Sequence, residues 1–154
     1  MRRLGANHVE VFDESRNTPD GLSASIHRTI STAGAGFAVD AVGGATGSAV
    51  IHSLGPKGRM LAYGTLSNDP LAFSPRVLMT TGSKVEGFWL GSFMADVSLP
   101  FKLRLVRRLT KLIQAGVLGT EIAQSYTLNQ IHDAVAAAEN SGVNGKVLLR
   151  IAES

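Results

Sequence analysis

The sequence predicts an α/β fold in which helices cover a parallel β-sheet. Strand-like and helix-like segments alternate along most of the 154 residues, and such alternation is typical of a parallel sheet with crossover helices. Residues 37–42 are almost uniformly apolar, as expected of a parallel strand buried on both faces. Glycines follow two of the predicted strands directly, at Gly43 and Gly44 and again at Gly64.

The elements of the first half are predicted from apolar spacing and from helix start and stop residues. Residues 2–6 look like the last turn of a helix, and residues 8–12 alternate like a short strand. Thr18, Pro19 and Asp20 favour a helix start, and this helix should end at Gly34. The next elements are predicted as a strand at 37–42, a helix at 45–54, a turn at 55–58 and a strand at 59–63.

The second half continues the same alternation. Its predicted elements are a loop with a short helical piece at 66–79, a strand at 84–90, a helix at 98–115, a strand at 124–128, a helix at 130–140 and a strand at 146–151. In open α/β sheets, ligands bind at the carboxyl ends of strands. The residues that follow each strand are therefore the first candidates for a site.

Composition limits the classes of function. With 44% hydrophobic and 18% charged residues the chain is typical of a globular domain, and a net charge of +3 does not by itself imply nucleic acid. Zero cysteines exclude disulfides and a thiolate zinc site, which fits a cytoplasmic protein. We find no targeting signal and no apolar run of membrane-spanning length.

The turn at 43–47 is the first candidate site. It lies between a strand and a helix, where glycine lets backbone approach a ligand and where the helix end favours anions. Its spacing is not that of a G-x-G-x-x-G phosphate loop, and no acidic residue follows at the expected distance. The turn is therefore either a tight connection or part of a ligand site.

Three other features of the sequence each have a functional and a purely structural explanation. The histidines His8, His27, His52 and His132 have no metal-ligand spacing, so surface or lightly buried positions are expected. Arg104, Arg107, Arg108 and Lys111 share one face of a predicted helix, which could meet phosphates but more often is a solvated face. The segment 144–146 either reaches a ligand or simply begins a strand.

Five segments, taken in order, resemble one enzyme superfamily. They are Leu-Gly-Ala-Asn-His-Val at 4–9, Val-Asp-Ala-Val-Gly-Gly at 39–44, Gly-Arg-Met-Leu-Ala-Tyr-Gly at 58–64, Gly-Phe-Trp-Leu-Gly at 87–91 and Gly-Lys-Val-Leu-Leu at 145–149. Their order is similar to that in medium-chain dehydrogenases/reductases. The nearest branch resembles the zinc-independent quinone oxidoreductases and 2-enoyl thioester reductases.

The resemblance implies a fold, a cofactor and a set of residues. The fold would be a partial Rossmann-type, doubly wound parallel sheet that lacks the first β-α-β unit, with a partial nucleotide-binding domain at 1–125 and a returning helix and strand at 126–154. The cofactor would be NADP, with NAD as the alternative, and no metal. The cofactor-binding residues would be Val42, Gly43, Gly44, Tyr63, Gly64, Thr65, Phe88, Trp89, Leu90, Asn144 and Lys146.

The resemblance covers the C-terminal half of such enzymes, without the phosphate loop or the catalytic lobe. We therefore expect the cofactor-side half of an oxidoreductase that transfers hydride to a quinone or a 2-enoyl thioester, with no catalytic residue and no activity alone. The alternatives are a non-catalytic α/β binding or oligomerisation domain, or a nucleic-acid binder using helix 100–115.

The expected strand order leaves one edge unpaired. In the order 3-2-1-4-5-6, residues 8–12 would be strand 3 and residues 37–42 strand 4. Without strands 1 and 2, strand 37–42 has one unpaired, apolar edge, and such an edge invites pairing. We expect residues 8–12 to repack beside it, or a homodimer to form through this edge or through strand 84–90.

Overall fold

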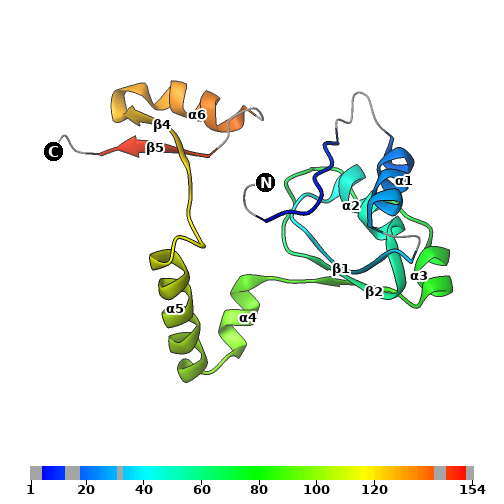
Figure 1. The fold of residues 1–154 in the computed structure, drawn as a ribbon. Helices are drawn as coiled ribbons and strands as arrows, with labels where there is room; N and C mark the ends of the chain where they lie inside the picture. Colours follow the sequence, from blue (N-terminus) through cyan, green and yellow to red (C-terminus); the bar gives the residue numbers. More distant parts are fainter. Residues whose placement is uncertain (1–4, 13–17, 31–32, 141–144, 152–154) are drawn as a thin grey trace. The chain divides into compact units, whose positions relative to one another are not determined.

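The computed structural model describes residues 5–12, 18–30, 33–140 and 145–151. Helices and parallel strands alternate along the chain (Figure 1), so the predicted α/β fold is confirmed. The chain forms two compact units, Met1–Asp96 and Val97–Ser154. The division at residue 125 that the resemblance implies stays a prediction.

The first unit is built on a three-stranded parallel sheet. Its strands are β1 (Ala35–Asp40), β2 (Leu54–Ala62) and β3 (Lys84–Gly87), in the spatial order β1-β2-β3. Asp40 is in register with Ala62, and Ala62 is in register with Gly87. The three strands therefore end together at one edge of the sheet.

Helices cover one face of this sheet. Helices α2 (Gly44–His52) and α3 (Pro75–Thr81) pack on the strands, and α1 (Pro19–Ile30) packs on α2 (Figure 1). The core beneath them contains Ile51, Leu54 and Met60. Thr18 begins α1 as predicted, because its Oγ1 accepts a hydrogen bond from the Gly21 N–H at 3.1 Å.

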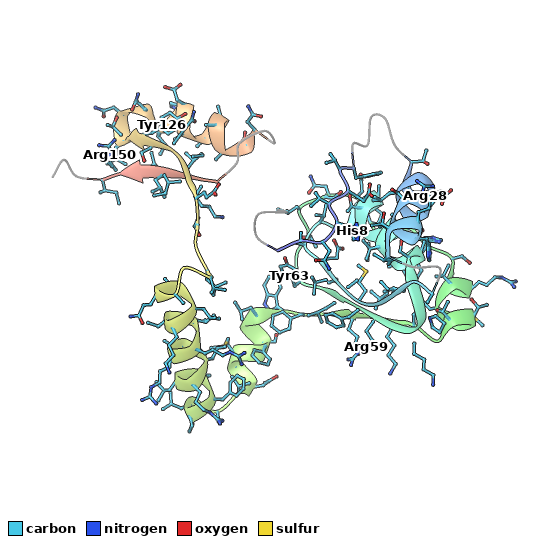
Figure 2. All side chains as sticks on the ribbon, viewed as in Figure 1. His8, Arg28, Arg59, Tyr63, Tyr126 and Arg150 are labelled. Carbon is cyan, nitrogen blue, oxygen red and sulfur yellow. The ribbon has the colours of Figure 1, made fainter. Side chains whose placement is uncertain are left out.

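The opposite face of the sheet is open. Phe37 and Val39 of β1 are 65% and 60% exposed. Arg59 of β2 forms an ion pair with Glu86 of β3 at 2.6 Å, and Figure 2 shows Arg59 on the side of the sheet away from α1. The strands of this sheet are therefore not buried on both faces, as the apolar run at 37–42 had suggested.

Residues 8–12 were predicted as a strand, and this prediction is wrong. Among the residues that the structure describes, β1 pairs with β2 alone, and no ladder includes residues 8–12. The segment instead runs beside α1, where Thr29 Oγ1 donates to Glu10 Oε1 at 3.1 Å. An alternating pattern becomes a strand only when a neighbouring backbone accepts its hydrogen bonds. The predicted helical turn at 2–6 lies partly outside the described residues.

The predicted turn at 55–58 is also different, because it lies inside β2. The register between β1 and β2 shifts after the pair Ala35–Leu54 and resumes at Phe37–Arg59. Lys57 has a φ of +59° within the resulting bulge. Gly55 is needed there, since a Cβ would overlap the Ala33 carbonyl oxygen.

Strand β3 is shorter than predicted. The Phe88 N–H still donates to the Ala62 carbonyl at 2.8 Å, but the Phe93 N–H already donates to the Trp89 carbonyl at 3.0 Å. The backbone thus leaves the sheet after Gly87 and enters α4 (Leu90–Asp96).

The second unit begins with a long helix, α5 (Leu99–Gln114). A smaller β-α-β unit follows, made of β4 (Ile122–Thr127), a 3-10 turn (Leu128–Gln130), α6 (Ile131–Glu139) and β5 (Lys146–Arg150). Strands β4 and β5 pair in parallel. In the part of the chain that the structure describes, no helix is long and apolar enough to cross a membrane.

Candidate functional site

Three loops meet at the carboxyl edge of the first sheet. Because β1, β2 and β3 end in register, the residues that follow them lie along one edge. These residues are Val42, Gly43 and Gly44 after β1, Tyr63, Gly64 and Thr65 after β2, and Phe88, Trp89 and Leu90 after β3. The structure thus brings together the three loops that the sequence resemblance selected.

Backbone hydrogen bonds fix the first two loops against each other. The Tyr63 N–H donates to the Asp40 carbonyl at 2.9 Å, and the Leu66 N–H donates to the Ala41 carbonyl at 3.2 Å. The Ser67 N–H donates to the Val42 carbonyl at 2.8 Å. The loop after β2 therefore follows any movement of the loop after β1.

Glycines make this close approach possible. Gly43 has φ +78° and ψ −152°, a conformation that essentially only glycine adopts, and the space beside it is open. Gly44 has φ +52°, and a Cβ there would lie 2.5 Å from Ser67 Oγ. At Gly64 a Cβ would lie 2.6 Å from the Ala41 carbonyl oxygen. Side chains at these positions would strain the turn or separate the loops.

An uncharged hollow of about 270 Å³ lies at this edge. Its lining consists of Ala62, Tyr63, Gly64, Thr65, Gly87, Phe88 and Trp89. Figure 2 shows Tyr63 at this edge of the sheet. The Trp89 and Tyr63 residues are 75% and 54% exposed, whereas the Phe88 ring packs on Phe93 with centroids 5.5 Å apart. Exposed aromatic faces beside a hollow suit a planar, uncharged ligand group.

Sequence reasoning missed the residue that anchors the first loop. Asp40 is buried, and its carboxylate accepts hydrogen bonds from the Val42 and Gly43 N–H groups. The available signal was an aspartate at the end of an apolar strand, since Asp often bonds its own backbone two residues further on. Ser48 of α2 was missed as well. Its Oγ donates to the Gly44 carbonyl at 2.6 Å and accepts from the Ala72 N–H at 2.9 Å.

Comparison with known proteins gives the family. A family model described as zinc-binding dehydrogenase matches residues 4–149, which is nearly the whole chain. The chain belongs to the zinc-binding dehydrogenase family. Among the residues that the structure describes, no group of three or more His, Cys, Asp or Glu side chains could hold a metal ion.

The relatives of the chain agree with the predicted resemblance. The mitochondrial enoyl-acyl-carrier-protein reductase of Bos taurus is 28% identical over 149 residues, which are 97% of this chain and 39% of the relative. A Bacillus thuringiensis protein assigned as an NADPH:quinone reductase has 27% identity and a TM-score of 0.74, with 95% of this chain and 43% of that chain covered. The similarity to quinone oxidoreductases and enoyl reductases is thereby confirmed.

A third comparison concerns the fold alone. A mycobacterial protein solved in complex with NADPH has a TM-score of 0.77 at 20% identity, with 97% of this chain and 44% of that chain covered. The chain spans about two fifths of the length of the curated relatives it matches.

The last two predicted cofactor residues belong to the second unit. Asn144 lies outside the described residues. Lys146 begins β5, and its N–H donates to the Glu121 carbonyl at 2.7 Å. The predicted contact of either residue with the cofactor stays a prediction.

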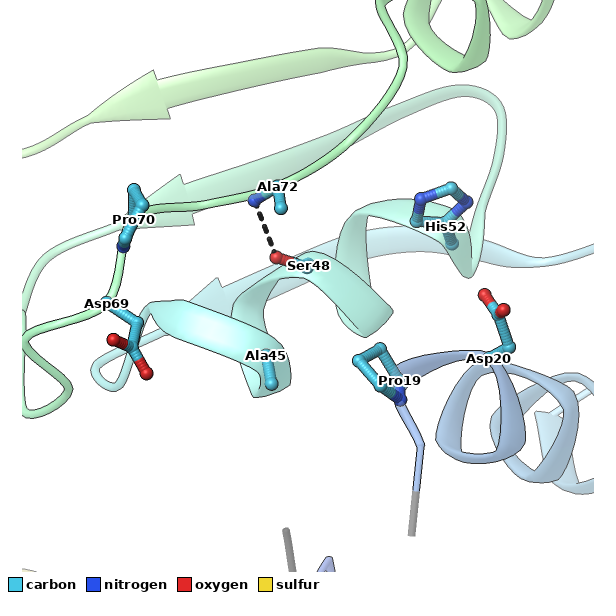
Figure 3. Close-up of a pocket in the computed structure, with 8 residues that line it drawn as sticks. All are labelled: Pro19, Asp20, Ala45, Ser48, His52, Asp69, Pro70 and Ala72. Carbon is cyan, nitrogen blue, oxygen red and sulfur yellow. Dashed lines mark hydrogen bonds between the residues drawn. The ribbon is translucent and has the colours of Figure 1, made fainter.

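Further hollows lie outside the three loops. One, of about 410 Å³, is lined by Pro19, Asp20, Ala45, Ser48, His52, Asp69, Pro70 and Ala72 (Figure 3). Within it, the Ser48 hydroxyl is already bonded to the Ala72 N–H. Another, of about 260 Å³, is on α5 and is lined by Phe101, Arg104, Leu105 and Arg108.

Proposed function

We propose that this chain forms the cofactor-facing part of an NAD(P)H-dependent oxidoreductase. The parent reaction is hydride transfer to the conjugated carbonyl of a quinone or a 2-enoyl thioester. One observation carries the proposal: the loops after β1, β2 and β3 share one sheet edge, and the ends of β2 and β3 with their loops line an aromatic hollow at this edge. The names of the enoyl reductase and quinone reductase relatives support the same reaction class.

The residues at this edge fit part of a nicotinamide cofactor. The hollow is lined by aromatic and small residues and by no charged side chain, which suits a planar ring better than phosphates. The open space beside Gly43 lets a ligand approach the backbone closely. When bound, the cofactor supplies the hydride, and the protein supplies orientation and exclusion of water. NADPH is the expected form, with NADH as the alternative.

The expected roles in this chain are those of binding residues. Tyr63, Phe88 and Trp89 line the ring-sized hollow, and the backbone of Gly43 and Gly44 forms the adjoining turn. We assign no catalytic acid or base and no metal ligand. Since the chain spans about two fifths of its curated relatives, we expect it to bind cofactor weakly and to show no turnover by itself.

The test is a titration of the purified chain with NADPH. Trp89 is the only tryptophan in the sequence, so quenching of its emission reports binding at the hollow directly. We expect weak, saturable quenching that Gly43→Val removes. Gly36→Ala is the matched control, because a Cβ at Gly36 meets nothing within 4 Å. No quenching by either cofactor would contradict the proposal, and oxidation of NADPH by a quinone or a 2-enoyl thioester would contradict the expected inactivity.

A homodimer is the expected assembly. In the described part of the sheet, β1 pairs with β2 alone, and its Phe37 and Val39 are largely exposed. An unguarded strand edge of this kind readily pairs with another chain. The two routes are this edge and the segment 84–90. A cytoplasmic location, expected from the lack of cysteine, belongs to the same proposal.

Helix α5 supports a second candidate function, the binding of nucleic acid. None of its residues is buried, and Arg104 and Arg108 lie beside Phe101 around one hollow. Basic side chains next to an aromatic ring can contact phosphates and a base. Binding of a generic oligonucleotide that weakens steeply with salt in the wild type, and is lost in Arg104→Glu/Arg108→Glu, is the expected result. Absence of binding at low salt removes this candidate.

A further inference from the structure

Asp40 holds a carboxylate inside the protein at the end of β1. The residue is only 4% exposed. Its Oδ1 accepts from the Val42 N–H at 2.9 Å and from the Gly43 N–H at 3.2 Å, and its Oδ2 accepts from the Gly43 N–H at 3.1 Å. A buried charge is stable only with such partners, and hydrogen bonds to a charged acceptor are stronger than neutral ones.

Helix α2 is shaped to leave room for this carboxylate. A Cβ at Gly47 would lie 2.6 Å from Asp40 Oδ2. Gly43 is the N-cap of α2, and a negative charge at a helix N-terminus is favourable. The first turn of α2 therefore fits Asp40 both in shape and in charge.

The turn that Asp40 fixes is connected to the next loop. The carbonyls of Asp40, Ala41 and Val42 accept the N–H groups of Tyr63, Leu66 and Ser67. Tyr63 lines the aromatic hollow. A change in the carboxylate of Asp40 is thus transmitted through the backbone to the residues that form the site.

We propose that Asp40 is a positioning residue, whose carboxylate sets the Gly43–Gly44 turn, and through it the loop 63–67, for cofactor binding. Because it occupies the N–H groups of Val42 and Gly43, this turn contacts an uncharged part of the ligand and not a phosphate. The inference rests on the proposed function, and it assigns to Asp40 a role that acts through the backbone.

The first test requires no cofactor. Amide resonances of the 15N-labelled chain are compared for wild type, Asp40→Asn and Asp40→Ala. We expect the Val42, Gly43, Leu66 and Ser67 resonances to move in both variants, and most in Asp40→Ala, since Asn keeps one acceptor oxygen. Millimolar inorganic phosphate should leave these resonances of the wild type unchanged. Unmoved resonances in both variants, or a phosphate-induced shift in the wild type, would overturn the inference.

The matched control is a buried hydroxyl remote from the turn. Ser53 is 1% exposed, and its Oγ donates to the Ala49 carbonyl at 2.8 Å. Ser53→Ala should lower stability without moving the Val42, Gly43, Leu66 or Ser67 resonances. This comparison separates positioning of the turn from a general loss of stability.

The second test measures NADPH affinity through Trp89 emission. We expect Asp40→Asn to bind about tenfold more weakly, in keeping with the loss of a charge-assisted hydrogen bond, and Ser53→Ala to stay within about twofold of wild type. Equal affinity of Asp40→Asn and wild type would overturn the inference. If the wild type binds no NADPH while the amide resonances respond as expected, the proposed function fails and the structural role of Asp40 stands.

A third variant displaces the carboxylate without removing it. Gly47→Ala places a methyl group against both Asp40 Oδ2 and Leu71 Cδ2, so we expect the same four resonances to move, whereas Gly36→Ala should leave them in place. If Asp40→Ala does not fold, Gly47→Ala and Gly36→Ala together still test whether the carboxylate sets the turn. No movement in a folded Gly47→Ala would show that the position of the carboxylate does not set the turn.

Discussion

The carboxylate of Asp40 lies against the bare Cα of Gly47, where a Cβ would come within 2.6 Å of Oδ2. One residue ends β1 and the other lies in the first half of α2. Their contact sets how closely the helix approaches the strand that it follows. The Gly43–Gly44 turn lies between these two residues, at the edge where three strands end, so we expect this contact to influence its conformation.

Gly64 and Gly87 give contrasting predictions at the same edge. Gly64→Ala places a methyl group 2.6 Å from the Ala41 carbonyl oxygen, and we expect a loss of about 1–3 kcal/mol in the free energy of unfolding because backbone cannot give way easily. Gly87→Ala meets nothing within 4 Å but narrows the hollow, so it should weaken NADPH binding with little change in stability. Urea denaturation and Trp89 quenching measure the two effects. A larger loss of stability in Gly87→Ala than in Gly64→Ala would contradict the close approach of the loops after β1 and β2.

Trp89 is expected to serve binding more than folding. It is 75% exposed, so Trp89→Ala should change the free energy of unfolding by no more than about 0.5 kcal/mol. NADPH affinity, followed by the fluorescence of the nicotinamide, should fall in Trp89→Ala and be largely kept in Trp89→Phe, which retains an aromatic face. An unchanged NADPH affinity in Trp89→Ala would show that the indole ring does not contribute to cofactor binding.

Ile51 is expected to contribute strongly to the stability of the core beneath α2. It is fully buried and packs in one cluster with Leu54 and Met60. Ile51→Ala should lower the free energy of unfolding by about 2–5 kcal/mol, the usual cost of emptying such a position. Met79→Ala is the control, since Met79 is 81% exposed and should change stability little. Equal losses in thermal or urea unfolding would show that α2 does not pack on the sheet as described.

Val39 tests which edge forms the expected dimer. Lysine on an edge strand opposes strand pairing, and Val39 is 60% exposed on β1. Val39→Lys should shift the sedimentation of the chain from dimer to monomer if β1 pairs with its copy, whereas Met79→Lys should leave it unchanged. A dimer that persists in Val39→Lys assigns the contact to the segment 84–90 or to another surface. A wild-type monomer would contradict both routes.

The sequence was sufficient for the alternation of strands and helices and for the position of the three loops. The start of α1 at Thr18 and the glycines after β1 and β2 are local signals, since each depends on a few neighbouring residues. The family resemblance selected the same loops, because they follow strands that end in register. Their function as a cofactor site stays a prediction.

Local signals were not sufficient wherever a distant partner decides the structure. Residues 8–12 alternate like a strand but have no neighbouring ladder in the described chain, and residues 55–58 form a bulge in β2 because β1 pairs across them. From the sequence, Asp40 is predicted only as a residue of strand 37–42. Its role as an anchor is visible in the structure, where Gly47 of α2 lies against its carboxylate. The sequence alone therefore determined the parallel α/β class and the loops after its strands, since periodicity and glycine act over short distances. The tertiary structure decided which segments pair and that the carboxylate of Asp40 is buried against α2, since strand pairing and burial depend on contacts that form only when the chain folds.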